Sequence, residues 1–149
     1  LRIEERQAEI VISALPTIEA DAAQMRQLFQ NLISNSLKFC SRQVVPRVGI
    51  ESRMHTGVEG APARWQIDVR DNGIGFPASE CERIFGIFER LHGRSEYDGA
   101  GIGLSICRRI VDRHGGTILA SSPSEGGALF TIILPASQPL STPATSPDR

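Results

Sequence analysis

Parts of the chain alternate between apolar and polar residues, a period typical of half-buried strands. In residues 64–71 the side chains of Trp65, Ile67 and Val69 share one face, and polar side chains fill the other. Short stretches rich in β-branched residues predict further strands at residues 9–15, 48–53, 117–121 and 128–134. Glycine-bearing connections between consecutive strands indicate hairpins, so we expect one mixed, mostly antiparallel sheet of about five strands.

A second spacing, with apolar residues every three or four positions, predicts helices. The first runs from an N-cap at Asp21 to about Cys40, and the last runs from Gly103 to the glycines at 115 and 116. Between them, the capping-box pattern of residues 79–82 precedes an apolar stripe of Ile84, Phe85, Phe88 and Leu91. Three helices on one face of the sheet make a two-layer α/β sandwich the expected fold.

The composition of the chain fits one domain: it has 149 residues, of which 40% are hydrophobic and 22% charged. A net charge of -1 provides no broad positive surface for nucleic acid or an anionic membrane, and no apolar run is long enough to span a bilayer. Three widely separated cysteines show no disulfide or zinc pattern, which favours the cytoplasm. Residues 136–149, rich in Ser, Thr and Pro, are predicted to be a disordered tail or linker. Because the chain begins at Leu1, we expect a piece of a longer protein.

One face of the first predicted helix carries Asn31, Asn35 and Lys38, opposite the apolar stripe. A solvated outer face is the ordinary interpretation of such residues. Asparagine is a poor helix former, however, and amide oxygens suit Mg²⁺, which proteins hold through few side chains together with substrate phosphates. On the residues alone, both interpretations stay open.

The end of the 64–71 strand directs a carboxylate inward, because Asp71 shares the parity of Trp65. A buried carboxylate is costly unless hydrogen-bond donors reach it. Asp71 either caps the turn at Asn72 and Gly73, or it accepts a hydrogen bond from a ligand such as the exocyclic amine of a purine. In the second case the glycines at 73 and 75 would let a ring approach the backbone closely.

Residues 98–105 place glycines at alternate positions directly before the last predicted helix. Converging backbone N–H groups at a helix N-terminus form a natural phosphate site, although a flexible connection would have the same composition. The spacing of Gly99, Gly101 and Gly103 differs from the dinucleotide-binding fingerprint. No Gly-Lys-Ser/Thr sequence follows, so a P-loop is excluded as well.

Taken in order, these segments resemble the motifs of sensor histidine kinases. Residues 27–39 resemble the N box, residues 71–76 the first glycine box, residues 84–92 the F box, and residues 99–104 the second glycine box. The resemblance identifies residues 9–135 as a catalytic ATP-binding domain with the Bergerat fold, which gyrase, mismatch-repair and heat-shock chaperone ATPases share. Residues 1–8 would be the end of the connection from a helical dimerisation and phosphoacceptor domain. The amino-acid sequence of the later motifs is most similar to that of kinases attached to phytochrome or PAS-type sensors.

The resemblance also implies roles for individual residues. Asn35 would coordinate Mg²⁺, with Asn31 helping directly or through water, and Lys38 would contact a phosphate. Asp71 would accept from the amino group of adenine, beside Gly75. Ala100 stands where the family often has Thr, which removes one possible phosphate donor. The full set of implied nucleotide contacts is Asp71, Gly73, Gly75, Phe76, Arg90, His92, Arg94, Tyr97, Gly99, Gly101, Ile102, Gly103 and Leu104.

The implied function is to bind Mg²⁺ and ATP and to deliver the γ-phosphoryl group to a histidine on a separate helical domain, for relay to a response-regulator aspartate. His55, in a predicted loop, His92 and His114 lack the sequence context of that acceptor. A homodimeric parent, soluble or membrane-anchored, and a monomeric isolated domain are expected. A hydrolytic ATPase is the less favoured alternative, because its water-activating glutamate is replaced by Asn31 and an amide is no general base. A nucleotide-binding pseudokinase or a protein-interaction module is the other alternative.

The F-box phenylalanines have two possible roles as well. At helical spacing, Phe85 and Phe88 are expected either to pack into the core or to form a surface that docks on the helical domain.

Overall fold

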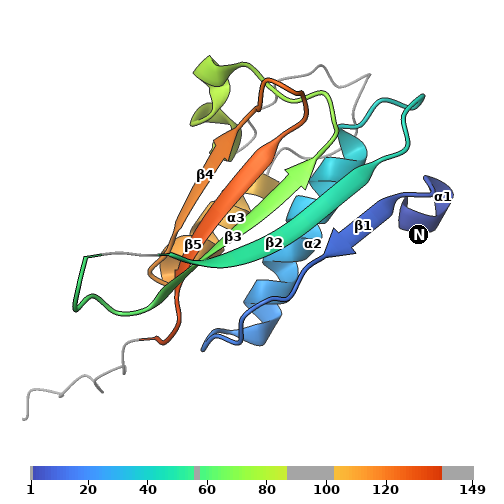
Figure 1. Cartoon of the computed structure of the whole chain (residues 1–149). Coiled ribbons are helices and arrows are strands. Elements are labelled where there is room, and N and C mark those ends of the chain that lie inside the picture. The colour runs from blue at the N-terminus through green and yellow to red at the C-terminus, as the bar shows by residue number, and fades with distance from the viewer. Residues whose placement is uncertain (1, 56–57, 87–102, 139–149) are drawn as a thin grey trace, which may run out of the picture.

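The computed structural model describes residues 2–55, 58–86 and 103–138. Its five strands form one sheet in the order β1-β2-β3-β5-β4 (Figure 1). Strand β1 pairs with β2 in parallel, and every other pairing is antiparallel, as predicted. The strands are β1 (Glu9–Ile12), β2 (Arg47–His55), β3 (Arg64–Asp71), β4 (Thr117–Ser121) and β5 (Leu129–Pro135).

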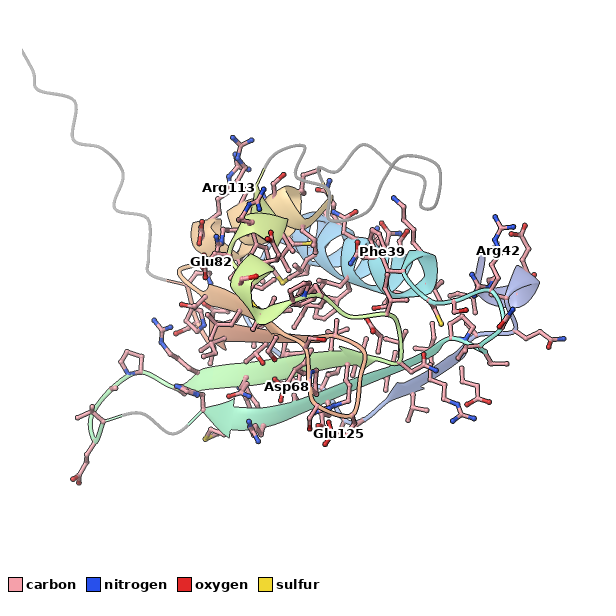
Figure 2. All side chains as sticks on the ribbon, turned by 90° about the horizontal axis from the view of Figure 1, so that it is seen from above. Phe39, Arg42, Asp68, Glu82, Arg113 and Glu125 are labelled. Atoms are coloured by element: carbon pink, nitrogen blue, oxygen red, sulfur yellow. The ribbon has the colours of Figure 1, made fainter. Side chains whose placement is uncertain are left out.

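Two long helices, α2 (Ala22–Lys38) and α3 (Gly103–Arg113), lie side by side against one face of this sheet (Figure 2). A short helix, α1 (Arg2–Glu5), precedes β1 and was not expected from the sequence. The architecture is the expected two-layer α/β sandwich with a mixed sheet. In the described part of the chain, no helix is long and apolar enough to cross a membrane.

The core lies between the helices and the inner face of the sheet. From α2 the side chains of Leu28 and Leu32 are completely buried, and from the sheet Val69, Phe130 and Ile132 are almost completely buried. The alternation predicted for residues 64–71 is confirmed, because Ile67 and Val69 are buried while Arg70 is exposed. Burial of these side chains is the main stabilising contribution to the fold.

The segment after the predicted capping box does not form the expected α-helix within the described residues. It forms two 3-10 turns, η1 (Ala78–Glu80) and η2 (Arg83–Phe85). Pro77 is the N-cap of the first turn and no side chain caps it, so Ser79 does not act as the predicted cap. Gly86, with ψ of 150°, takes an extended conformation that ends the second turn. Phe88 and Leu91, which were part of the predicted stripe, lie outside the described residues.

Smaller corrections concern the strand ends. Strand β1 stops at Ile12 rather than at residue 15. His55 is the last residue of β2, paired with Arg64, and does not lie in a loop as expected. Of the predicted tail, residues 136–138 are described, and the backbone N–H of Ala136 donates to the carbonyl oxygen of Ala63 at 2.9 Å. The rest of the tail lies outside the described residues.

The start of α2 is joined to the end of α3. Asp21 is the N-cap, as predicted: its side chain accepts a hydrogen bond from the backbone N–H of Gln24 at 2.9 Å. The backbone N–H of Asp21 donates to Nε2 of His114 at 3.1 Å. Because Nε2 accepts, Nδ1 carries the ring proton and donates it to the carbonyl oxygen of Ile110 at 2.7 Å. The buried imidazole therefore bridges the two helices at one end of the helical layer.

Candidate functional site

The three polar residues of α2 are half-buried. Nδ2 of Asn31 donates to the carbonyl oxygen of Gly103, the first residue of α3, at 3.5 Å. The amide of Asn31 also forms a hydrogen bond with Cys107, whose pKa burial raises to about 12. This part of α2 therefore faces the beginning of α3, and the interpretation of a fully solvated face is wrong for Asn31. Farther along α2, Nζ of Lys38 lies 5.5 Å from the centroid of the Phe39 ring.

Asp71 ends β3 and is 9% exposed. One of its oxygens, Oδ1, accepts two hydrogen bonds of 2.9 Å, from the backbone N–H groups of Gly73 and Ala128. The bond from Gly73 confirms the local interpretation, in which the carboxylate caps the following turn. This interpretation does not exclude a ligand, because each oxygen of a carboxylate can accept more than one hydrogen bond.

The hydroxyl of Ser36, on α2, completes the surroundings of Asp71. It donates to the carbonyl oxygen of Leu32 at 3.0 Å, and its interaction with the carboxylate lowers the pKa of Asp71. Burial raises the pKa of Asp71, and the hydrogen bonds from Gly73 and Ala128, together with the interaction with Ser36, act in the opposite direction. The net direction is upward, so the fold holds this carboxylate in an environment that disfavours its charge.

The loop after Asp71 packs closely against the end of α2 and against the turn before β5. The backbone N–H of Ile74 donates to the carbonyl oxygen of Phe39 at 2.9 Å, and a Cβ on Gly73 would lie 2.6 Å from the same oxygen. Gly75 has a φ of +66°, and a Cβ there would overlap Ser122. The glycines at 73 and 75 are therefore needed by the protein's own packing, whether or not a ring approaches them.

The residues expected to contact the phosphates are described only in part. Gly103 begins α3, and Leu104 packs at the edge of the core. Since α3 has 11 residues, its N-terminus carries a partial positive charge. The other expected contacts lie outside the described residues: Arg90, His92, Arg94, Tyr97, Gly99, Gly101 and Ile102.

Phe85 of the F box belongs to the core, with 4% of its surface exposed. Its ring meets the ring of Phe130 edge-on, with centroids 6.3 Å apart. The guanidinium of Arg108, on α3, lies 4.3 Å from the centroid of Phe85 and forms an ion pair of 3.1 Å with Glu82. Of the two roles considered for Phe85, core packing is confirmed.

The structure thus brings Asp71, the C-terminal half of α2 and the loop of residues 72–76 together at one end of the sandwich. The hydrogen bond from the backbone N–H of Ile74 to the carbonyl oxygen of Phe39 joins the loop to α2, and the hydroxyl of Ser36 interacts with the carboxylate of Asp71. Sequence reasoning missed Ser36 and Ala128 as partners of the carboxylate. The backbone N–H of Ala128 has no signal in the sequence, whereas a serine on an inward-facing position of α2 was a signal that could have been used.

Comparison with known proteins defines the class. The model of the family described as "Histidine kinase-, DNA gyrase B-, and HSP90-like ATPase" matches residues 20–138. The chain belongs to this ATPase family. Within it, the chain is similar to the ATP-binding domain of sensor histidine kinases, as its motifs predicted.

Two curated relatives illustrate the similarity. Cyanobacterial phytochrome A of Nostoc sp. is 43% identical over 134 residues, which cover 90% of this chain and 17% of the relative. The adaptive-response sensory kinase SasA of Prochlorococcus marinus is 41% identical over 127 residues, which cover 85% of this chain and 32% of the relative. The chain therefore spans one third or less of the length of these relatives.

Two solved structures have the same fold. The mycobacterial sensor histidine kinase MprB superposes with a TM-score of 0.73 at 24% identity, covering 92% of this chain and 88% of that one. Full-length ShkA in complex with AMPPNP superposes with a TM-score of 0.71 at 30% identity, covering 93% of this chain and 27% of that one.

Proposed function

We propose that this domain binds ATP with Mg²⁺ and delivers the γ-phosphoryl group to a histidine on a separate helical domain, for relay to the receiver domain of a response regulator. The observation that carries the proposal is the buried Asp71, whose Oδ1 is fixed by two backbone N–H groups. A carboxylate held in this way presents an acceptor at the edge of the site, which suits the exocyclic amine of adenine. The parent protein is proposed to be a homodimer that works in the cytoplasm.

The polar residues of α2 are proposed to serve the phosphate end of the nucleotide. Since the amide nitrogen of Asn31 donates to Gly103, its oxygen is the atom left for a cation. Amide oxygens of Asn31 and Asn35 are ligands of the kind that Mg²⁺ accepts, and Mg²⁺, when bound, neutralises phosphate charge. Lys38 contributes a positive charge one turn farther on, and the N-terminus of α3 adds backbone donors at Gly103 and Leu104.

The loop residues Gly73, Gly75 and Phe76 are proposed to border the base. Phe76 packs against Phe130, with ring centroids 6.3 Å apart, so its backbone is supported from the core side. The nucleotide contacts expected from residues 87–102, outside the described part of the chain, remain predictions.

The first experiment measures thermal stability in the presence of Mg²⁺ and AMPPNP. We expect the midpoint of unfolding to rise for the wild type, because a ligand that binds only the folded state stabilises it. The rise should be lost in Asn35→Ala and Asp71→Ala and kept in Ser34→Ala, an exposed position on the same helix. Absence of a shift in the wild type would refute nucleotide binding.

A second experiment separates a kinase from a pseudokinase. The domain is mixed with the helical phosphoacceptor domain of its parent protein and radiolabelled ATP, and acid-labile phosphate on histidine is counted. Transfer that depends on Asn35 supports the kinase. ATP binding without transfer favours the pseudokinase, and steady release of phosphate without the acceptor favours a hydrolytic ATPase.

A further inference from the structure

The turn between β4 and β5, residues 122–128, holds both ends of the loop that runs from Asp71 to Phe76. At the first end, the backbone N–H of Asp71 donates to the carbonyl oxygen of Ala128, and the N–H of Ala128 donates to Oδ1 of Asp71, each at 2.9 Å. At the other end, the backbone N–H of Phe76 donates to the hydroxyl oxygen of Ser122 at 3.4 Å. The loop is therefore tied to one turn at two points.

Ser122 is oriented by a strong hydrogen bond of its own. Its hydroxyl donates to the carbonyl oxygen of Gly127 at 2.6 Å, which occupies its single proton. The hydroxyl oxygen is then left with its lone pairs, and it can act toward Phe76 only as an acceptor. The direction of both bonds is fixed by this arrangement.

The glycine before Phe76 lies directly on the same hydroxyl. A Cβ added to Gly75 would overlap Oγ of Ser122 and would lie 2.7 Å from the carbonyl oxygen of Gly127. The backbone of residues 75 and 76 thus rests against Ser122 without an intervening side chain. A shift of this hydroxyl would shift the backbone that borders the proposed base site.

We propose that Ser122 is a positioning residue for the base side of the nucleotide site. It holds the backbone of Gly75 and Phe76 in the position against which the purine ring would lie. The inference rests on the proposed function, since it assumes that the base lies against this loop. Among the described residues, the hydrogen bonds of Ser122 are with Phe76 and Gly127 and not with the polar residues of α2, so we expect its effect to be confined to recognition of the base.

The test compares Ser122→Ala with Ser124→Ala, a matched control at an exposed position of the same turn. Affinity is measured by calorimetry for two probes in the presence of Mg²⁺: ATP, and tripolyphosphate, which has no base. We expect Ser122→Ala to bind ATP about tenfold more weakly, as for the loss of one partly buried hydrogen bond, and to bind tripolyphosphate as the wild type does. Ser124→Ala should behave like the wild type with both probes.

Two results would overturn the inference. The first is unchanged ATP affinity in Ser122→Ala, and the second is an equal loss for ATP and tripolyphosphate, which would indicate a general structural role. Amide hydrogen exchange at Phe76 without nucleotide tests the anchoring separately, and we expect faster exchange in Ser122→Ala. If the wild type fails to bind ATP while this exchange still accelerates, the proposed function fails and the anchoring by Ser122 stands. Unchanged exchange refutes the anchoring.

Discussion

Replacing Asp71 by Asn removes the charge of the central carboxylate and keeps its shape. Both backbone donors, from Gly73 and Ala128, point at Oδ1, so the new amide must place its carbonyl oxygen there. Its NH₂ group then takes the position of Oδ2. In the proposed complex a donor would face the amino group of adenine, which is also a donor, and the fixed orientation prevents the amide from flipping.

The size of the effect follows from the bond that is lost. A hydrogen bond to a charged group contributes about 1.5–3 kcal/mol, which corresponds to an affinity lower by about 10- to 150-fold. The nucleotide-free domain should respond in the opposite direction. Since burial raises the pKa of Asp71, its contribution to stability is present below the unfolded pKa and is lost as pH rises through the folded one. At neutral pH we therefore expect the midpoint of unfolding of Asp71→Asn to be at least that of the wild type.

Calorimetry with ATP and with inosine triphosphate, both in the presence of Mg²⁺, is the decisive assay. Inosine carries a carbonyl oxygen where adenine carries its amino group, so the new NH₂ should reverse or abolish the preference for adenine. Asp68→Asn, on the same strand and the opposite face, is the control and should keep the preference. Unchanged ATP affinity in Asp71→Asn would refute the placement of the base, and a large loss of nucleotide-free stability would contradict the expected effect on the folded domain.

Three further substitutions test other parts of the site. Ser36→Ala removes an interaction that lowers the pKa of Asp71, so acidification should abolish ATP binding at a higher pH than in the wild type; a pH series with Ser34→Ala as control checks this. Gly73→Ala forces a Cβ against the carbonyl oxygen of Phe39 and should destabilise the domain by about 1–3 kcal/mol in urea unfolding; Gly49→Ala, with open space at its Cβ, should change little. His114→Ala leaves the N–H of Asp21 without its partner and removes one of the two hydrogen bonds to the carbonyl of Ile110, and we expect a loss of about 1–3 kcal/mol; a loss near zero would mean that water replaces the imidazole.

Local periodicity predicted most of the fold. The parity of β3 placed Asp71 inward, and the polar N-cap at Asp21 marked the first residue of α2 correctly, because both signals depend on neighbours within a few positions. The segment around residues 79–86 was assigned wrongly as an α-helix. Its apolar residues Ile84 and Phe85 are also buried when the chain forms the short turn η2 instead. Contacts with residues distant in the sequence decide whether such a segment forms an α-helix or short turns. The contact of Arg108 with Phe85 is one of them.

The site was predictable to the extent that side chains carry its chemistry. Asn31 and Asp71 were found from their residue type and spacing, but the donors that orient Asp71 are backbone groups of Gly73 and Ala128, whose positions depend on how β5 pairs with β3. A backbone N–H is identical in every residue except proline, so no composition or motif marks it. The contact of Asn31 with Gly103 likewise depends on the crossing of two helices.

The imidazole of His114 connects the beginning of α2 to the end of α3. The two helices are joined where Asp21 meets His114 and again where Asn31 donates to Gly103, and Phe39 and Arg113 lie at opposite ends of the layer (Figure 2). From Asp21 to Asn35 the helix is about 21 Å long, so a tilt of about 5° at the contact with His114 would move Asn35 by about 2 Å. Small changes in packing at this contact are thus magnified into displacements as large as the distance between a cation and its ligand. We therefore expect the contact between Asp21 and His114 at the far end of the layer to contribute to the placement of Asn35.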